Sequence, residues 1–280
     1  VGQFENMKIG ATLKRLVKYA VMTCVLAIGA QAQQSDLMPL HTMQDSQGLA
    51  AVGRLDIRGK GFCTAALIRE QLILTAAHCV YNADGTRVDP AQFAFRAGLR
   101  GGRAEATRGI ARAIPHPGYH FKENATDAPA VALDIAILEL DRPIRMARLQ
   151  PYQIAPRPLT GDELRVVSYG RGREEAPSLQ ESCRVLGRDI GVIVMTCDVE
   201  YGSSGSPVFL MVNGEMRIAS VVSAMAQMDG TRVALGPSLA GPLNALLSHF
   251  ATLPPARQRG TQRLIRSGER NDTGAKFIRP

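Results

Sequence analysis

The sequence predicts an all-β fold closed by one C-terminal helix, and three observations carry that prediction. From Leu49 onward, short apolar runs are separated by turn residues, a spacing typical of all-β proteins. Strands do not alternate with amphipathic helices, which argues against an α/β fold. Asn213-Gly214 stands between two apolar runs and predicts a tight β-hairpin.

Nine strands are expected from the apolar runs. Hydrophobic residues make up 45% of the chain and charged residues 21%, so a packed core is expected. The chain has no tryptophan and few other aromatic residues, so small aliphatic side chains must fill that core. The expected strands are Ala50–Ile57, Phe62–Ile68, Leu72–Thr75, Ala91–Ala97, Leu133–Leu140, Glu163–Tyr169, Gly191–Thr196, Pro207–Val212 and Met216–Ala224.

One helix is expected near the end of the apolar part of the chain. Leu243, Leu246, Leu247 and Phe250 follow the i, i+3, i+4, i+7 pattern of one helical face. Pro242 suits the first turn, where its missing N–H costs nothing. Beyond residue 253 the chain becomes rich in arginine and poor in apolar residues, so 254–280 is predicted to be a basic disordered tail.

The N-terminal region predicts export. Four basic residues precede a 12-residue apolar run, Tyr19–Ala30, and Ala30-Gln-Ala32 is a typical cleavage sequence. A run of 12 residues is too short to span ~30 Å of hydrocarbon, so no stable membrane anchor is expected. Residues 1–32 are therefore predicted to be a signal peptide region, residues 33–44 a mobile lead-in and residues 45–253 the folded domain. The expected address is the periplasm or the medium.

The net charge of +8 is confined to the two ends of the chain. Residues 1–32 carry four basic and one acidic residue, and residues 251–280 carry seven basic and two acidic residues. The body between them has 22 residues of each sign. A neutral body argues against nucleic acid as a partner.

Three motifs in order carry the chemistry. Thr75-Ala-Ala-His78-Cys79 is followed by Asp134-Ile-Ala-Ile-Leu138 and then by Gly202-Ser-Ser204-Gly-Ser-Pro207. A serine hydroxyl is a weak nucleophile that needs a base, and the base needs a group to orient it. Ser204 is therefore the candidate nucleophile, His78 the candidate base and Asp134 its orienting carboxylate. Asp134 falls in an apolar run that is expected to be a strand, where an unpaired carboxylate is costly.

The three motifs, in the order His, Asp, Ser, resemble those of trypsin-like serine endopeptidases, and the serine motif is similar to that of bacterial glutamyl-endopeptidase-like members. The resemblance covers roughly Leu49 to Phe250. It implies two six-stranded antiparallel β-barrels with a boundary near residues 145–160, a short C-terminal helix and a catalytic cleft between the barrels. It also implies a protein or peptide substrate and hydrolysis through an acyl-enzyme, without a cofactor.

Four cysteines remain after the apolar N-terminal run, and an even number in an exported chain suggests disulfides. Of three possible pairings, Cys63–Cys79 with Cys183–Cys197 is the expected one, and its first bridge resembles the family bridge beside the catalytic histidine. No metal site is expected. The chain has no C-x-x-C, and His116, His120 and His249 lack ligand spacing.

The resemblance extends to the groups around the nucleophile. The backbone N–H groups of Gly202 and Ser204 are the expected oxyanion-hole donors. Ser203 stands where animal members carry an aspartate that pairs with a new N-terminus, so that activation switch is expected to be absent.

Two residues are candidates for substrate binding. Asp198 lies six residues before Ser204, the offset of the pocket-floor aspartate in trypsin, although a structural role for Asp198 is equally open. Ser223 falls where the family often has a serine in the pocket wall, and Ala224 and Met225 follow it. The glutamyl endopeptidases that this serine motif resembles use a histidine in the strand after the serine. This chain has no histidine between Ser204 and His249, so specificity for glutamate is not expected.

Two other functions remain open from the sequence. One is a non-catalytic binding protein on a protease scaffold, which would lack serine-hydrolase reactivity. The other is an esterase-like hydrolase, which would turn over small esters without cleaving peptides.

Overall fold

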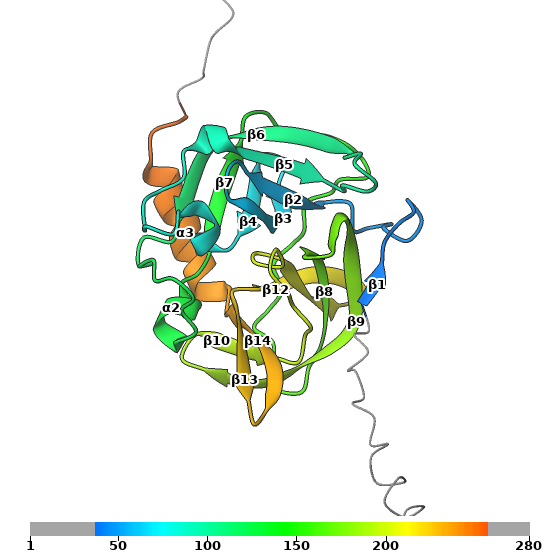
Figure 1. The fold of residues 1–280 in the computed structure, drawn as a ribbon, viewed down its shortest axis with the longest axis vertical. Helices are drawn as coiled ribbons and strands as arrows, with labels where there is room; N and C mark the ends of the chain where they lie inside the picture. The colour runs from blue at the N-terminus through cyan, green and yellow to red at the C-terminus, as the bar shows by residue number, and fades with distance from the viewer. Residues whose placement is uncertain (1–36, 257–280) are drawn as a thin grey trace, which may run out of the picture. The chain divides into compact units, whose positions relative to one another are not determined.

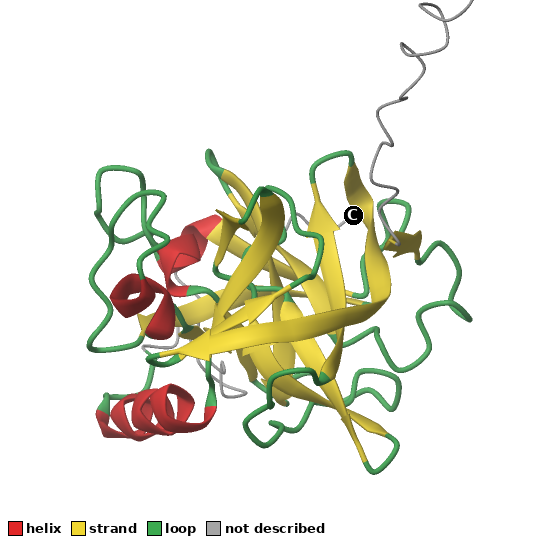
Figure 2. Ribbon diagram, turned by 90° about the horizontal axis from the view of Figure 1, so that it is seen from below, coloured by secondary structure: helices red, strands yellow, loops and turns green. Residues whose placement is uncertain are grey.

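The computed structural model describes residues 37–256, and within them the predicted all-β class is confirmed (Figures 1 and 2). The predictions for the signal peptide region, the first residues of the lead-in and most of the basic tail lie outside these residues. Besides the strands, residues 37–256 form the short helix α2 (Ala128–Ala132), the longer helix α3 (Ala240–Thr252) and two 3-10 turns, Ala77–Val80 and Pro90–Gln92.

The first half of the chain forms a closed antiparallel barrel of six strands, as predicted. The strand order is β2-β3-β4-β7-β6-β5. Alternate side chains of Val52–Ile57 and Phe93–Ala97 are buried, as a strand with one face on a core requires. The strands are β2 (Val52–Ile57), β3 (Gly61–Arg69), β4 (Leu72–Thr75), β5 (Phe93–Ala97), β6 (Ala106–Pro115) and β7 (Ala136–Leu140).

The second half forms one sheet of eight strands, in place of the six strands expected for a second barrel. Its order is β12-β11-β8-β9-β10-β14-β13, and β1 pairs with β9 beside this path. The additional pairing arises because β9 is 17 residues long and presents an edge to β1. The strands are β1 (Leu37–Pro39), β8 (Glu163–Gly170), β9 (Arg173–Asp189), β10 (Val192–Met195), β11 (Pro207–Val212), β12 (Glu215–Val221), β13 (Ala224–Met228) and β14 (Thr231–Pro237).

The hairpin predicted at Asn213-Gly214 joins β11 to β12. Val212 pairs with Glu215 across the turn. Asn213 and Gly214 have φ values of 53° and 82°, the two positive values that a tight two-residue hairpin turn requires.

Several strands are absent from the sequence prediction. They are β1, β6, β9 and β14, together with most of β13. Arginine interrupts β6 at two positions, and β9 carries arginine, glutamate and Pro177, so neither stands out as an apolar run. Both are held by neighbours on two sides, which a propensity argument cannot foresee.

Part of the predicted mobile lead-in is structured. Leu37, Met38 and Pro39 pair with β9, and the Leu40 side chain is 2% exposed within the main apolar core. The structure thus extends regular pairing into the predicted lead-in from residue 37 onward, because a short strand can add to an open sheet edge whatever its length.

Each end of the described chain packs against the half of the protein that is farther from it in the sequence. Strand β1 lies against β9 in the second sheet, whereas α3 returns to the first barrel and contacts β7 (Figure 1). Leu243 and Leu246 are buried in the same core as the barrel strands, which confirms the predicted apolar face. Arg112 of β6 holds α3 against the barrel. Its guanidinium stacks on the Phe250 ring and donates to the Pro254 carbonyl at 2.6 Å.

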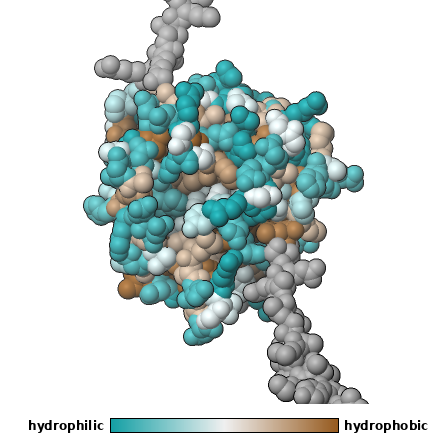
Figure 3. All heavy atoms as spheres, in the orientation of Figure 1, coloured by the Kyte–Doolittle hydropathy of each residue, from teal (hydrophilic) through white to brown (hydrophobic). Residues whose placement is uncertain are grey.

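The surface drawn in Figure 3 is mostly hydrophilic, with paler and more hydrophobic residues toward its centre. No helix within residues 37–256 has the length and apolar character needed to cross a membrane.

Candidate active site

The three candidate catalytic residues line one cleft of about 740 Å³. His78 follows β4 and Asp134 precedes β7, both in the first barrel, and Ser204 lies on the loop before β11 in the second sheet. The cleft therefore takes its groups from segments up to 126 positions apart in the sequence, which the pairing of the two halves brings together.

His78 and Asp134 form a pair with two contacts. Nδ1 of His78 lies 2.7 Å from Oδ2 of Asp134, and the backbone N–H of His78 donates to Oδ1 at 2.8 Å. A carboxylate only accepts, so the proton lies on Nδ1 and Nε2 is left as a proton acceptor. The Asp134 side chain is 4% exposed and that of His78 is 27% exposed, so the pair is desolvated on the aspartate side alone.

Asp134 does not lie in a strand, contrary to the prediction. It sits between α2 and β7, and its N–H donates to the Val131 carbonyl at 3.1 Å. The apolar run includes Leu133, which lies in the loop, so hydrophobicity alone placed the start of the strand too early. The short helix α2 and the loop turn the carboxylate toward His78.

Ser223 is the third group on the same carboxylate. Its hydroxyl donates to Oδ2 of Asp134 at 2.5 Å, and the residue also lines the cleft. The sequence indicated Ser223 as a wall residue and gave no indication of this hydrogen bond. The carboxylate thus accepts from the His78 backbone, the His78 ring and Ser223, which compensates its burial.

Two glycines shape the loop that carries Ser204. Gly202 has φ +95°, and a Cβ there would lie 2.3 Å from the Phe62 ring. Gly205 has φ +78°, and a Cβ there would lie 2.0 Å from the Thr75 hydroxyl. Both positions therefore exclude side chains, by backbone conformation and by space.

Thr64 of β3 ties this loop to the first barrel. Its N–H donates to the Ser204 carbonyl at 2.8 Å, and its hydroxyl donates to the Gly202 carbonyl at 3.0 Å. Thr64 is fully buried, and its own carbonyl accepts from the Thr75 hydroxyl at 2.8 Å. The position of the loop is thus fixed by hydrogen bonds from the barrel that carries His78.

The backbone N–H groups of Gly202 and Ser204 donate to no acceptor within the described residues. The Ser203 carbonyl accepts from the Ser206 N–H at 2.9 Å, so the Ser204 N–H, on the opposite side of that peptide plane, points the other way. Gly202 and Ser204 both line the cleft. Two free donors beside a serine can bind an oxygen that acquires negative charge.

A half-buried arginine, Arg173, contacts this loop. Its guanidinium donates to the Ser168 carbonyl at 2.6 Å and to the Ser203 hydroxyl at 3.3 Å. Burial lowers the pKa of Arg173, and the nearby carboxylates of Asp198 and Glu200 oppose that shift. An arginine remains charged through such shifts, so it is a fixed cation behind the serine loop. The sequence gave no indication of this role.

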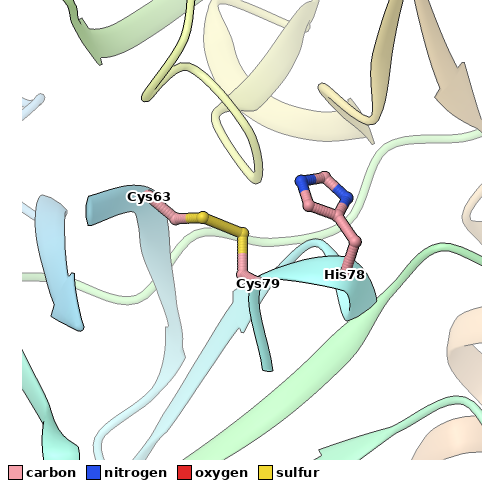
Figure 4. A group of neighbouring side chains, drawn as sticks. All are labelled: Cys63, His78 and Cys79. Carbon is pink, nitrogen blue, oxygen red and sulfur yellow. A yellow bond between two sulfur atoms is a disulfide. The ribbon is translucent and has the colours of Figure 1, made fainter. Parts of the chain in front are cut away.

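Both predicted disulfides are present, Cys63–Cys79 and Cys183–Cys197. Cys63, His78 and Cys79 are the one group in the described part of the chain whose ligand atoms lie close enough to hold a metal ion. Both sulfurs are bonded to each other beside the imidazole (Figure 4), so neither is a thiolate that could bind a metal. The bridge instead holds the 3-10 turn that carries His78.

The structure does not bring Asp198 to the cleft. Its backbone N–H donates to Oε1 of the buried Gln180 at 2.8 Å, and Val199, Glu200 and Tyr201 take the positions that line the cleft. Of the two predicted substrate-binding residues, only Ser223 faces the cleft.

A profile of the trypsin family matches residues 41–244. Transmembrane protease serine 9 of Rattus norvegicus is 37% identical over 95 residues, which are 32% of this chain and 8% of that protein. Serine protease SP24D of Anopheles gambiae is 29% identical over 175 residues, 55% of this chain and 60% of that protein. Coagulation factor IX of Oryctolagus cuniculus is 30% identical over 102 residues, 36% and 34% of the two chains. The chain spans less than two thirds of each of these relatives.

Among solved structures, that of a Glu endopeptidase in complex with MPD superposes with a TM-score of 0.60. The match covers 72% of this chain and 91% of the other at 22% identity, which shows a shared fold.

Proposed function

This chain belongs to the trypsin family, and from that premise we propose that it is an exported serine endopeptidase whose catalytic residues are His78, Asp134 and Ser204. The observation that carries the proposal is the His78–Asp134 pair, with Nδ1 and Oδ2 2.7 Å apart, in one cleft with Ser204. A buried carboxylate bound to an imidazole beside a serine is the arrangement that nucleophilic acyl transfer needs.

In the proposed reaction, Nε2 of His78 takes the proton of the Ser204 hydroxyl as its oxygen attacks the substrate carbonyl. The N–H groups of Gly202 and Ser204 stabilise the resulting oxyanion. Each such donor contributes about 2.7–4 kcal/mol to the transition state. Asp134 keeps the ring proton on Nδ1 and stabilises the imidazolium.

Collapse of the tetrahedral intermediate breaks the C–N bond. His78 gives its proton to the leaving amine, and the substrate acyl group remains as an ester on Ser204. Water then attacks that ester, with His78 again accepting a proton and returning it to Ser204. The products are a carboxylate and an amine, and the cycle needs no metal ion or cofactor.

Strand β13 supports a peptide as substrate. It is the last strand in the order of the second sheet, and its residues Ala224 and Met225 line the cleft. The free edge of a strand offers backbone N–H and C=O groups to an extended peptide. A small ester has no backbone to use this edge, so the edge favours a peptidase over an esterase.

Two disulfides support an address outside the cytoplasm, because disulfides persist in oxidising compartments.

The test is labelling of the purified, oxidised protein with a fluorophosphonate probe, with Ser204→Ala as the matched control. Both proteins are checked for equal thermal stability. The proposal expects wild-type labelling that the variant loses, followed by cleavage of an unfolded protein substrate at internal bonds.

Two results would contradict the proposal. Absence of labelling in folded wild type would favour a binding protein without catalysis. Labelling with turnover of small esters but no peptide cleavage would favour an esterase.

A further inference from the structure

The cleft beside Ser204 has an apolar end in the second half of the protein. Two segments line the cleft there, Val199–Tyr201 and Val222–Met225. When the N–H groups of Gly202 and Ser204 bind the scissile carbonyl, the substrate residue that carries this carbonyl lies next to these segments. They are therefore the walls that meet the side chain on the acyl side of the scissile bond, the P1 side chain.

The floor between these walls belongs to an apolar core. Val199, Val222 and Ala234 are buried members of the cluster that fills the second sheet. Met225 is half-buried, packs against this cluster and pairs directly with Ala234 across β13 and β14. A long, flexible thioether side chain fills space well, so Met225 limits how far a substrate side chain can enter.

The charged residues that line this end of the cleft contact neighbours, and the Arg171 guanidinium stacks on the Tyr201 ring. Asp198 lies outside the lining residues, and its backbone is held by Gln180. Glu200 lines the cleft, but its Oε1 lies 3.2 Å from Nη1 of Arg232 on β14. This pair is exposed and therefore weak, so the main cost for a charged substrate side chain is the loss of its water against apolar side chains.

We infer that the enzyme selects an uncharged aliphatic P1 side chain, such as valine or leucine, and that Met225 sets the depth of the P1 site. The inference rests on the proposed function, since it concerns the substrate of the same cleft. It differs from specificity for arginine, lysine or glutamate, each of which would need Glu200 or Arg171 to leave its present neighbour and pair with the substrate.

The test is a set of fluorogenic peptides that differ only at P1, with valine, leucine, phenylalanine, arginine or glutamate. Valine and leucine are expected to give kcat/KM values at least about tenfold above those for arginine and glutamate. A higher value for arginine or glutamate, or no cleavage of any of the five peptides, would overturn the inference.

Variants test the role of Met225. Met225→Gly and Met225→Ala each deepen the site, so the ratio of kcat/KM for phenylalanine to that for valine is expected to rise about tenfold. Met228→Gly is the matched control, because Met228 lies on the same strand outside the cleft lining. An unchanged ratio in both Met225 variants would remove Met225 from the P1 site.

Fluorophosphonate labelling of the same preparations distinguishes failure of the P1 inference from failure of the proposed function. A labelled protein that prefers a charged P1 residue contradicts the P1 inference and leaves the proposed function standing. An unlabelled, folded protein contradicts both.

Discussion

The hydroxyl of Ser223 lies 2.5 Å from Oδ2 of Asp134, the same carboxylate oxygen that contacts the His78 ring at 2.7 Å. One oxygen therefore receives a hydrogen bond from each half of the protein, because Ser223 precedes β13 of the second sheet whereas His78 belongs to the first barrel. The orientation of the proposed base depends on how the two halves fit together.

Replacing Ser223 by alanine is expected to lower kcat about tenfold with little change in KM. The loss of one donor loosens Asp134 and hence the His78 ring, while the cleft keeps its walls. Steady-state kinetics on a peptide ester checks this. Ser220→Ala is the control, since Ser220 also loses a buried hydrogen bond, to the Pro237 carbonyl, but does not line the cleft. Equal loss of kcat in both variants would contradict a specific role for Ser223.

Replacing Gly202 by alanine is expected to lower kcat by about 100-fold or more, because the new methyl group would collide with Phe62 and displace an oxyanion donor. Gly214→Ala separates this effect from the strain of a positive φ. Gly214 has φ +82° in the β11–β12 hairpin, with open space around its Cβ position. That control should cost about 1–2 kcal/mol of stability and leave kcat unchanged.

Arg173→Gln is expected to slow both fluorophosphonate labelling and peptide hydrolysis, because the Ser203 hydroxyl and the Ser168 carbonyl lose their charged partner. We expect Arg173→Lys to restore only part of the rate, since an ammonium cannot place two donors as the guanidinium does. Arg188→Gln is the control on the same strand, because Arg188 donates to the Pro158 carbonyl away from the serine loop. A normal labelling rate in Arg173→Gln would show that Arg173 does not support the loop that carries Ser204.

Removing either disulfide by paired alanine substitution is expected to cost about 3 kcal/mol, because the two bridges close loops of similar separation, 16 and 14 residues. Only loss of Cys63–Cys79 should also lower kcat, since Cys79 directly follows His78. Chemical denaturation and kinetics on both double variants give the comparison. Equal kcat values for the two would show that the bridge beside His78 is purely structural.

The stability of the fold is expected to fall as the pH drops below about 6.5. Burial, and then the nearby His249, lower the pKa of His116 from 6.5, so the unfolded chain binds this proton first. The contribution of neutral His116 to stability is complete above the pKa of this histidine in the unfolded chain. It is lost as the pH falls toward the lower pKa of His116 in the folded protein. Protonation at Nδ1 also removes the acceptor of the Gly118 N–H.

Melting temperatures at pH 7.5 and pH 5 test this expectation. The decrease should be smaller in His116→Asn than in wild type. His120→Asn, at an exposed position in the same loop, controls for the loss of a histidine. An equal decrease in melting temperature for wild type and His116→Asn would exclude His116 as the cause of the pH dependence.

The sequence predicted those features that local pattern encodes. The β11–β12 hairpin and the apolar face of α3 were foreseen in this way, as were the disulfide pairs, whereas the first barrel was implied by the resemblance to a known family. The sequence predicted His78, Asp134 and Ser204 as one site, and the structure places them in one cleft. Their catalytic roles remain a prediction.

What escaped prediction depends on pairing between distant segments. Strand β9 carries arginine, glutamate and proline and becomes a strand because β8, β10 and β1 pair with it. Arg173 and Thr64 act on the serine loop across 30 and about 140 residues of sequence, a relationship that no local motif records. Asp198 was placed by its offset from Ser204, but offset alone does not fix which way a loop turns.

The return of α3 to the first barrel has a consequence for biosynthesis. A ribosome delivers the barrel strands first and the helix that covers them last, so the barrel emerges with part of its core still uncovered. Strand β1 likewise waits for its partner β9, which is made about 140 residues later. The cleft that we propose to be catalytic therefore cannot be complete before Met225, its last lining residue, has left the ribosome.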